Sequence, residues 1–180
     1  MLVWWETLPD SARRQWTLDP FVSVGPLRFG MSPEEVTGAL RECATGVRQY
    51  TRPVLAEGRY GSVRGDCREF GLMLFYGPGG GLQGISVDAL KGPQVAAAGR
   101  GLVGRAPSGL EQWMINRSER RKPDLELIYL EPGLLGSRTL GVVIALQRTG
   151  DRLLSRPVFL PSEAMDDPYF FLPAEAWPTR

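Results

Sequence analysis

The clearest hydrophobic pattern in this chain begins at Ser32 and has the period of a helix. Ser32 precedes Pro33 and stands three residues before Glu35, which together make a capping box with proline at the first helical position. Apolar residues then recur at spacings of three and four, as on the buried face of a helix: Val36, Ala39, Leu40 and Cys43. The sequence therefore predicts a helix over residues 33–44.

A glycine-rich turn between two apolar runs predicts a β-hairpin in the middle of the chain. The runs cover residues 69–76 and 82–87, and the turn Gly77-Pro78-Gly79-Gly80-Gly81 separates them. Residues 21–30 predict further extended structure, broken at Gly25-Pro26, whereas residues 46–65 show no clear period.

The second half of the chain repeats this order of elements. Ser108 and Glu111 form another S-x-x-E pattern, which predicts a second capped helix. The capping serines lie 76 positions apart but the Pro-Gly turns only 54, so about 22 more residues separate helix from hairpin in the first half. The strands predicted around and after Pro132-Gly133 cover residues 125–130, 140–146 and 152–160.

These elements predict one α+β domain over residues 1–180, with an antiparallel sheet and two or three short helices on one face. A chain of 180 residues is long enough to bury a core without disulfides or metals. The repeated order suggests a degenerate tandem duplication, with pseudo-repeats at 21–90 and 100–160 and a C-terminal tail at 161–180. Chance is the alternative, because capping boxes and hairpins are common.

The start of the first helix resembles a motif of known proteins. Residues 27–36 read LRFGMSPEEV, which is similar to the G-M-[ST]-x-x-x-V helix start of the actinomycete β-lactamase-inhibitory proteins and of the small outer-membrane assembly lipoproteins of similar fold. The resemblance implies tandem repeats of helices on an antiparallel sheet and a binding role. We expect this chain to lack their signal peptide, lipobox and paired disulfides, so no partner and no binding residue carries over.

Composition excludes whole classes of function. The formal net charge is +1, from 21 basic and 20 acidic residues, which is no footprint for nucleic acid or an anionic membrane. The absence of histidine rules out Ser-His-Asp and Cys-His hydrolases and histidine-containing zinc sites. A local basic cluster, at a helix C-terminus where the helix dipole favours cations, comprises Arg117, Arg120, Arg121 and Lys122.

The two cysteines, Cys43 and Cys67, depend on the compartment for their state. No charged region followed by a long apolar run opens the chain, so we expect no signal peptide and a cytoplasmic protein. The reducing cytosol favours free buried thiols, and a disulfide between the two is the alternative. No apolar stretch approaches the roughly 20 residues that span a bilayer.

Residues 99–104, GRGLVG, match the dinucleotide-binding pattern G-x-G-x-x-G, and Asp124 lies 20 positions beyond the last glycine. That fold needs a buried strand leading into the motif and a helix opening inside it. The preceding residues 94–98 make a poor strand, and the predicted helix starts only at Ser108. We therefore expect a flexible connector here, with no cofactor and no metal.

The terminal aromatics and one acidic pair are the candidate partner-binding residues. Tryptophan and tyrosine are enriched at interface hot spots, and adjacent carboxylates suit a basic partner. The alternatives are packing on the core for the aromatics and a solvated turn for the carboxylates. The candidates are Trp4, Trp5, Asp166, Asp167, Tyr169, Phe170, Phe171 and Trp177.

The function these observations favour is non-catalytic protein binding, by an immunity or inhibitor protein that blocks a partner toxin or enzyme. The alternative is a small-molecule-binding protein or a histidine-free enzyme of a bacterial biosynthetic pathway, with a pocket lined by the tryptophans. A subunit that works only as an oligomer is a third reading, and the sequence leaves the oligomeric state open.

Overall fold

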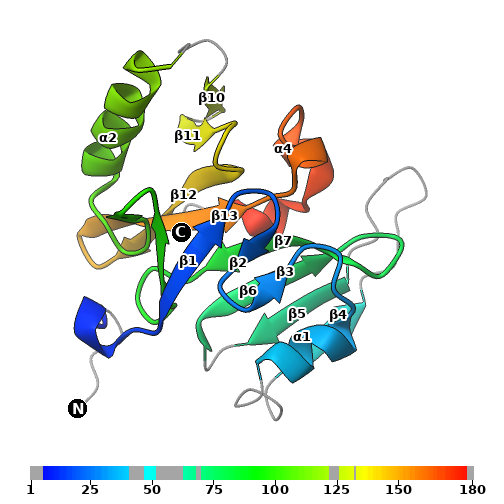
Figure 1. The fold of residues 1–180 in the computed structure, drawn as a ribbon. Helices are drawn as coiled ribbons and strands as arrows, with labels where there is room; N and C mark the ends of the chain where they lie inside the picture. Colours follow the sequence, from blue (N-terminus) through cyan, green and yellow to red (C-terminus); the bar gives the residue numbers. More distant parts are fainter. Residues whose placement is uncertain are drawn as a thin grey trace.

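The structure is a computed structural model, and it describes residues 6–40, 47–51, 63–67, 70–121, 126–131 and 133–177. Within these residues the chain is an α+β protein with two sheets, one antiparallel and one mixed, which confirms the predicted class. Figure 1 shows the two sheets and the helices around them.

The larger sheet has eight strands in the order β10-β11-β12-β13-β7-β6-β5-β4, and all neighbours run antiparallel. It consists of two four-stranded meanders that meet where β13 pairs with β7, through Val158 with Ser86 and Phe159 with Ile85. The strands are β4 (Val47–Thr51), β5 (Val63–Cys67), β6 (Leu72–Tyr76), β7 (Leu82–Val87), β10 (Leu127–Leu130), β11 (Leu134–Ser137), β12 (Val142–Thr149) and β13 (Arg152–Phe159).

A helix precedes each meander: α1 (Pro33–Ala39) the first and α2 (Pro107–Glu119) the second. Their first residues lie 74 positions apart. The turn with Gly79 joins the third and fourth strands of its meander, whereas the turn with Gly133 joins the first and second. The two Pro-Gly turns are therefore not equivalent, which explains their short spacing. The duplication itself stays a prediction.

The first predicted hairpin is confirmed as β6 and β7. For the second hairpin, the strand predicted to follow the turn is the wrong one. The strand after Gly133 is β11, four residues long, and not the predicted run 140–146, which belongs to β12. The sequence hides β11 because a four-residue strand with Gly136 inside it has no readable alternation.

The capping box of α1 is confirmed, and that of α2 is wrong. Ser32 Oγ accepts a hydrogen bond from Glu35 N at 3.2 Å, and Glu35 Oε2 accepts one from Ser32 N at 2.7 Å. In α2, by contrast, Ala106 is the N-cap and makes no side-chain cap bond. Pro107 suits the first helical position, so the helix starts one residue before Ser108. The predicted helix over 33–44 is too long, because α1 ends at Ala39 and Leu40 is its C-cap with non-helical backbone angles; residues 41–44 lie outside the described residues.

The extended structure predicted over residues 21–30, broken at Gly25-Pro26, is confirmed as two strands of a smaller sheet, but the sheet as a whole was not predicted, because its strands have only two to five residues. They are β1 (Gln15–Asp19), β2 (Ser23–Val24), β3 (Leu27–Arg28), β8 (Gln94–Ala97) and β9 (Arg100–Gly101), in the order β3-β2-β1-β8-β9. β1 runs parallel to β8, and the other neighbours are antiparallel. The sheet thus joins the N-terminal residues to the link between the two meanders.

The glycine pattern at residues 99–104 belongs to this sheet. β8 and β9 form a tight hairpin whose central residues, Ala98 and Gly99, have φ angles of +47° and +77°. Two positive φ angles in a two-residue turn match the twist of a hairpin. The motif is therefore part of an ordered β-turn, and the predicted connector is wrong.

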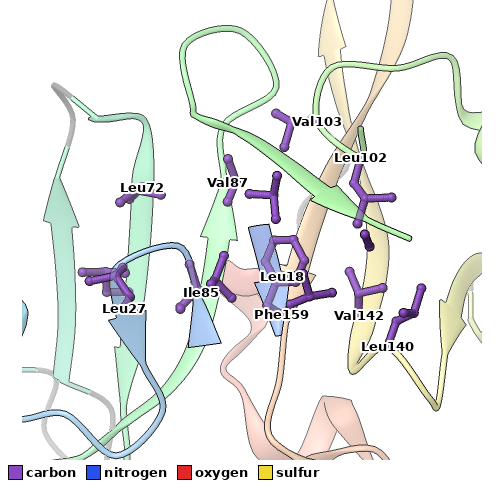
Figure 2. Packing of buried hydrophobic residues seen from close by; sticks show 14 of the residues in the cluster. Leu18, Leu27, Leu72, Ile85, Val87, Leu102, Val103, Leu140, Val142 and Phe159 are labelled. Carbon is purple, nitrogen blue, oxygen red and sulfur yellow. The ribbon is translucent and has the colours of Figure 1, made fainter. Parts of the chain in front are cut away.

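Two hydrophobic clusters cover the two faces of the larger sheet. On one face, the smaller sheet and the buried sides of α1 and α2 enclose the first cluster, which includes Leu18 of β1 and Phe159 of β13 (Figure 2). On the other face, Phe75 and Val143 pack in the second cluster with residues of the C-terminal tail. The short helix α4 (Pro168–Phe171) belongs to that tail, so the prediction that all helices share one face is wrong for α4.

A buried arginine fixes the N-terminal residues to the loop between β7 and β8. Arg13 is 5% exposed and donates to four backbone carbonyls. Nη1 donates to Gly92 O at 2.7 Å, Nη2 to Ala89 O at 2.7 Å and Leu90 O at 3.1 Å, and Nε to Leu8 O at 3.0 Å. Burial lowers the pKa of the Arg13 guanidinium.

Replacing this guanidinium should destabilise the protein. We expect Arg13→Met to lower the free energy of unfolding by about 2–4 kcal/mol, because buried carbonyls lose charged donors. Denaturant titration followed by tryptophan fluorescence measures the change. Arg28→Met, at an exposed position of β3, is the control and should leave the midpoint nearly unchanged. Equal midpoints for the two variants would show that the Arg13 contacts contribute no net stability.

Tyr76 provides a pH-dependent test of the first cluster. Its side chain is fully buried, and no hydrogen-bond partner among the described residues reaches its hydroxyl. Burial, and then the charge of Glu34, raise the pKa of Tyr76 to about 12. Since this pKa exceeds the ordinary value of about 10 in the unfolded chain, the neutral phenol favours folding up to about pH 10, and that contribution is lost as the pH rises towards 12.

We therefore expect Tyr76→Phe to be at least as stable as the unmodified protein at pH 7, because it removes an unpaired buried hydroxyl. The variant should also lose less stability between about pH 10 and pH 12. Unfolding midpoints across this range measure both effects. The control is Tyr129→Phe, at a residue that is 60% exposed. A neutral-pH loss confined to Tyr76→Phe would mean that the hydroxyl has a partner.

Candidate functional site

The C-terminal segment, residues 161–177, holds most of the candidate partner-binding residues. It contains two 3-10 turns, Ser162–Ala164 and Ala174–Ala176, on either side of α4. Figure 1 shows this orange-to-red segment leaving the end of β13. Four of its buried residues belong to the second hydrophobic cluster, and they are Ala164, Met165, Leu172 and Ala176. The segment is thus a cover for the larger sheet.

The C-terminal segment packs against a glycine of β7. A Cβ atom at Gly84 would lie 2.6 Å from Leu172 Cδ2 and 2.7 Å from Cδ1, so the leucine side chain sits directly on the strand backbone. Beside it, Gln83 Nε2 donates to Phe171 O at 3.3 Å. These contacts hold the segment at α4 and leave its outer side to solvent.

The two aspartates have different roles. Asp167 is the N-cap of α4, and its Oδ1 accepts a hydrogen bond from Phe170 N at 3.1 Å. The Asp166 side chain is 96% exposed, with Arg138 Nη1 at 3.5 Å from its Oδ1. Glu163 is also exposed on the same segment. The local surface is therefore acidic, and the Asp166 carboxylate is almost fully exposed on it.

The aromatic side chains of this segment also differ: some pack against neighbouring groups, and one is exposed to solvent. The rings of Tyr169 and Trp177 meet edge to face, with centroids 5.3 Å apart. The Tyr169 hydroxyl donates to Glu131 O, and burial, followed by the charge of Glu131, raises the pKa of this phenol. Phe171 packs against the second cluster, whereas Phe170 is 39% exposed. The structure therefore brings together Asp166, Asp167 and the four aromatics of this segment, with Phe170 the most outward. Trp4 and Trp5 lie outside the described residues.

A buried carboxylate was missed by the sequence analysis. Glu126 is 2% exposed and accepts hydrogen bonds from Arg117, Ser137 and Thr139. Arg117 Nη1 also donates to Thr139 Oγ1 at 3.0 Å. In the sequence Glu126 is one polar residue in a strand pattern, and only the fold brings its partners around it.

The cluster around Glu126 has the residue types of a catalytic site, but its side chains are too buried for a substrate to reach them. Ser137 is 1% exposed, and its Oγ additionally accepts a hydrogen bond from Leu140 N at 3.2 Å. The carboxylate oxygens already bind three side chains. The cluster therefore ties the end of α2 to β11 and to the turn before β12, and its geometry supports a structural role.

The described tryptophans do not line a common pocket. Trp16 and Trp113 pack against the first hydrophobic cluster, whereas Trp177 packs against the second, on the opposite face of the larger sheet. Among the described residues, no three or more acidic or cysteine side chains gather as metal ligands would. Within the same residues, no helix has the length and apolarity needed to cross a membrane.

Cys67 is disulfide-bonded, so the expected free thiol is wrong for this residue. The expectation came from the assumed reducing compartment and not from geometry. Cys67 is fully buried at the end of β5. Cys43, the other cysteine of the chain, lies outside the described residues.

The fold and the site together describe a two-sheet α+β protein whose C-terminal segment has one packed and one exposed side. The chain matches no protein-family model, no curated protein and no solved structure. Its function is therefore argued from the geometry of the site.

The close contact between Leu172 and Gly84 provides a test of whether packing keeps the C-terminal segment ordered. Gly84→Ala places a methyl group against the leucine, so we expect the segment to loosen and the free energy of unfolding to fall by about 1–3 kcal/mol. Chymotrypsin should then cut faster at the segment's aromatic residues. The control is Gly79→Ala, since a Cβ atom there meets nothing within 4 Å. Equal cleavage rates for the two variants would mean that the contact between Leu172 and Gly84 does not hold the segment in place.

Proposed function

We propose that this chain is a non-catalytic protein-binding module of the immunity or inhibitor type, which blocks a partner toxin or enzyme. The binding surface is the outer side of the C-terminal segment, centred on Asp166 and Phe170. The proposed partner is a toxin or enzyme, as expected from the sequence. Of the eight candidate residues, the proposal places Asp166 and Phe170, whose side chains are accessible, at the centre of the surface.

One observation carries the proposal: an accessible carboxylate and an accessible aromatic ring on a segment that is otherwise fixed. Asp166 is 96% exposed at its side chain and Phe170 is 39% exposed, while Leu172 and Met165 hold the segment to the sheet. A large apolar side chain kept in solvent beside an ordered charge is the arrangement of an interface anchor and its rim. Because the backbone is already ordered, binding costs little conformational entropy.

The chemistry of the surface suggests a partner with a basic patch. Glu163, Asp166 and Asp167 are all exposed on this segment, and Arg138 is the cation near Asp166. A positive partner surface would gain from these carboxylates mainly in the rate of association. Phe170 would supply the apolar contact that slows dissociation.

The compartment belongs to the same proposal. The sequence analysis expects the cytoplasm, where disulfides are rare. The disulfide at Cys67 favours an oxidising compartment. We therefore propose that the partner is met under oxidising conditions, with the cytoplasm as the alternative.

The surface can be tested by comparing two double variants in a pull-down from the native host, quantified by mass spectrometry. Asp166→Arg with Phe170→Ser should reduce recovery of the stoichiometric partner by about tenfold or more, because it reverses the charge and removes the anchor. Asp151→Arg with Leu153→Ser makes the same kinds of change at exposed positions near the start of β13 and should leave recovery unchanged.

Two outcomes would contradict the proposal. Equal recovery of the partner with both double variants would mean that the C-terminal segment is not the binding surface. Recovery of a bound metabolite and no stoichiometric protein would favour the small-molecule alternative. Circular dichroism of both variants checks that each remains folded.

A further inference from the structure

The outer edge of β10 is an open end of the larger sheet. Among the residues that the structure describes, β10 pairs only with β11. Arg138 N donates to Glu126 O at 2.7 Å, which shows that Glu126 points its backbone towards β11. Because hydrogen bonding alternates along an antiparallel strand, Ile128 and Leu130 also face β11, while Leu127 and Tyr129 direct their N–H and C=O groups outwards.

The side chains of this edge are apolar and accessible. Tyr129 is 60% exposed, and it is the most exposed of the large hydrophobic side chains in the described part of the chain. Leu127 is half-buried and lies on the same face of the strand, two residues away. An unpaired strand edge with apolar side chains and no proline is a template for pairing with another strand.

The two ends of β10 carry opposite charges. Arg117 binds Glu126, so the last turn of α2 lies beside the start of the strand. Arg120 and Arg121 follow this turn and are exposed. Glu131 comes directly after the strand and is also exposed, and the Tyr169 hydroxyl holds its carbonyl in place.

This polarity makes the edge complementary to itself. In a two-fold antiparallel pair of identical strands, the start of each strand lies beside the end of the other. The basic end of one copy would therefore face Glu131 of the other. With the two-fold axis at Ile128, Leu127 and Tyr129 of the two copies would exchange backbone hydrogen bonds, and their side chains would form cross-strand aliphatic–aromatic pairs.

We propose that β10 pairs antiparallel with β10 of a second copy of this chain, so that the larger sheets of two copies continue into each other. The strand has only four residues, so the dimer should be weak and should form with rising concentration. The proposal is independent of the partner-binding surface, because the variants that test it leave Asp166 and Phe170 unchanged.

Sedimentation velocity of the full chain from about 5 to 500 µM tests the pairing. We expect a monomer–dimer equilibrium for the unmodified protein. Tyr129→Pro should weaken it by about tenfold or more, because proline removes the outward N–H while leaving the bonds to β11 intact. Hydrogen exchange should show the amides of Leu127 and Tyr129 gaining protection as the concentration rises.

A charge swap keeps the test independent of any effect of proline on folding. Arg121→Glu should weaken the dimer roughly two- to tenfold at low salt, and adding Glu131→Arg to it should restore the affinity. Arg28→Glu, an equal charge change on β3, is the control. A protein that stays monomeric throughout, or a dimer that neither Tyr129→Pro nor Arg121→Glu weakens, would overturn the proposal.

Discussion

An eight-stranded sheet with apolar side chains on both faces needs two covers, and the rest of the molecule supplies them. The pairing of β13 with β7 creates this sheet from two meanders and brings Val158 and Phe159 to opposite faces. Phe159 is covered by the smaller sheet, and Val158 by the C-terminal segment. At about 25 cal/mol for each Å² of apolar surface removed from water, neither face can stay open at low cost. The positions of the small sheet, the helices and the tail follow from this constraint.

The same constraint explains the dual character of the C-terminal segment. The C-terminal segment forms a single layer over the sheet, so each of its side chains either packs on the sheet or faces solvent. Leu172 and Ala176 are buried, whereas Asp166 and Phe170 remain outside. The aromatic richness that marked this segment in the sequence thus has two causes: Phe171 and Trp177 pack, and Phe170 stays available. Packing and binding were alternatives for the segment as a whole, and the structure shows packing for Phe171 and Trp177 and solvent exposure for Phe170.

Local signals were read correctly where the neighbouring residues alone decide the structure. The capping box of Ser32 and Glu35 and the hairpin around Gly79 need no distant partner. The errors lie where distant or competing interactions decide. Pro107 displaced the cap expected at Ser108, and the smaller sheet is completed only where β1 pairs with the distant strand β8. The partners of Glu126 lie up to 13 positions along the chain, so no local pattern could reveal them.

Nineteen of the 21 basic residues are arginines, and three of them have clear structural roles. Arg117 belonged to a basic cluster in the sequence, yet its side chain turns inward to Glu126 and Thr139. Arg156, only 8% exposed, donates from Nε to Ser86 Oγ at 2.9 Å across the junction of the two meanders. Arg13 joins the N-terminal residues to the loop after β7. A planar guanidinium with five donors can satisfy several acceptors from different segments at once, which a lysine ammonium cannot do in the same geometry. These three arginines therefore connect parts of the chain that lie far apart in the sequence.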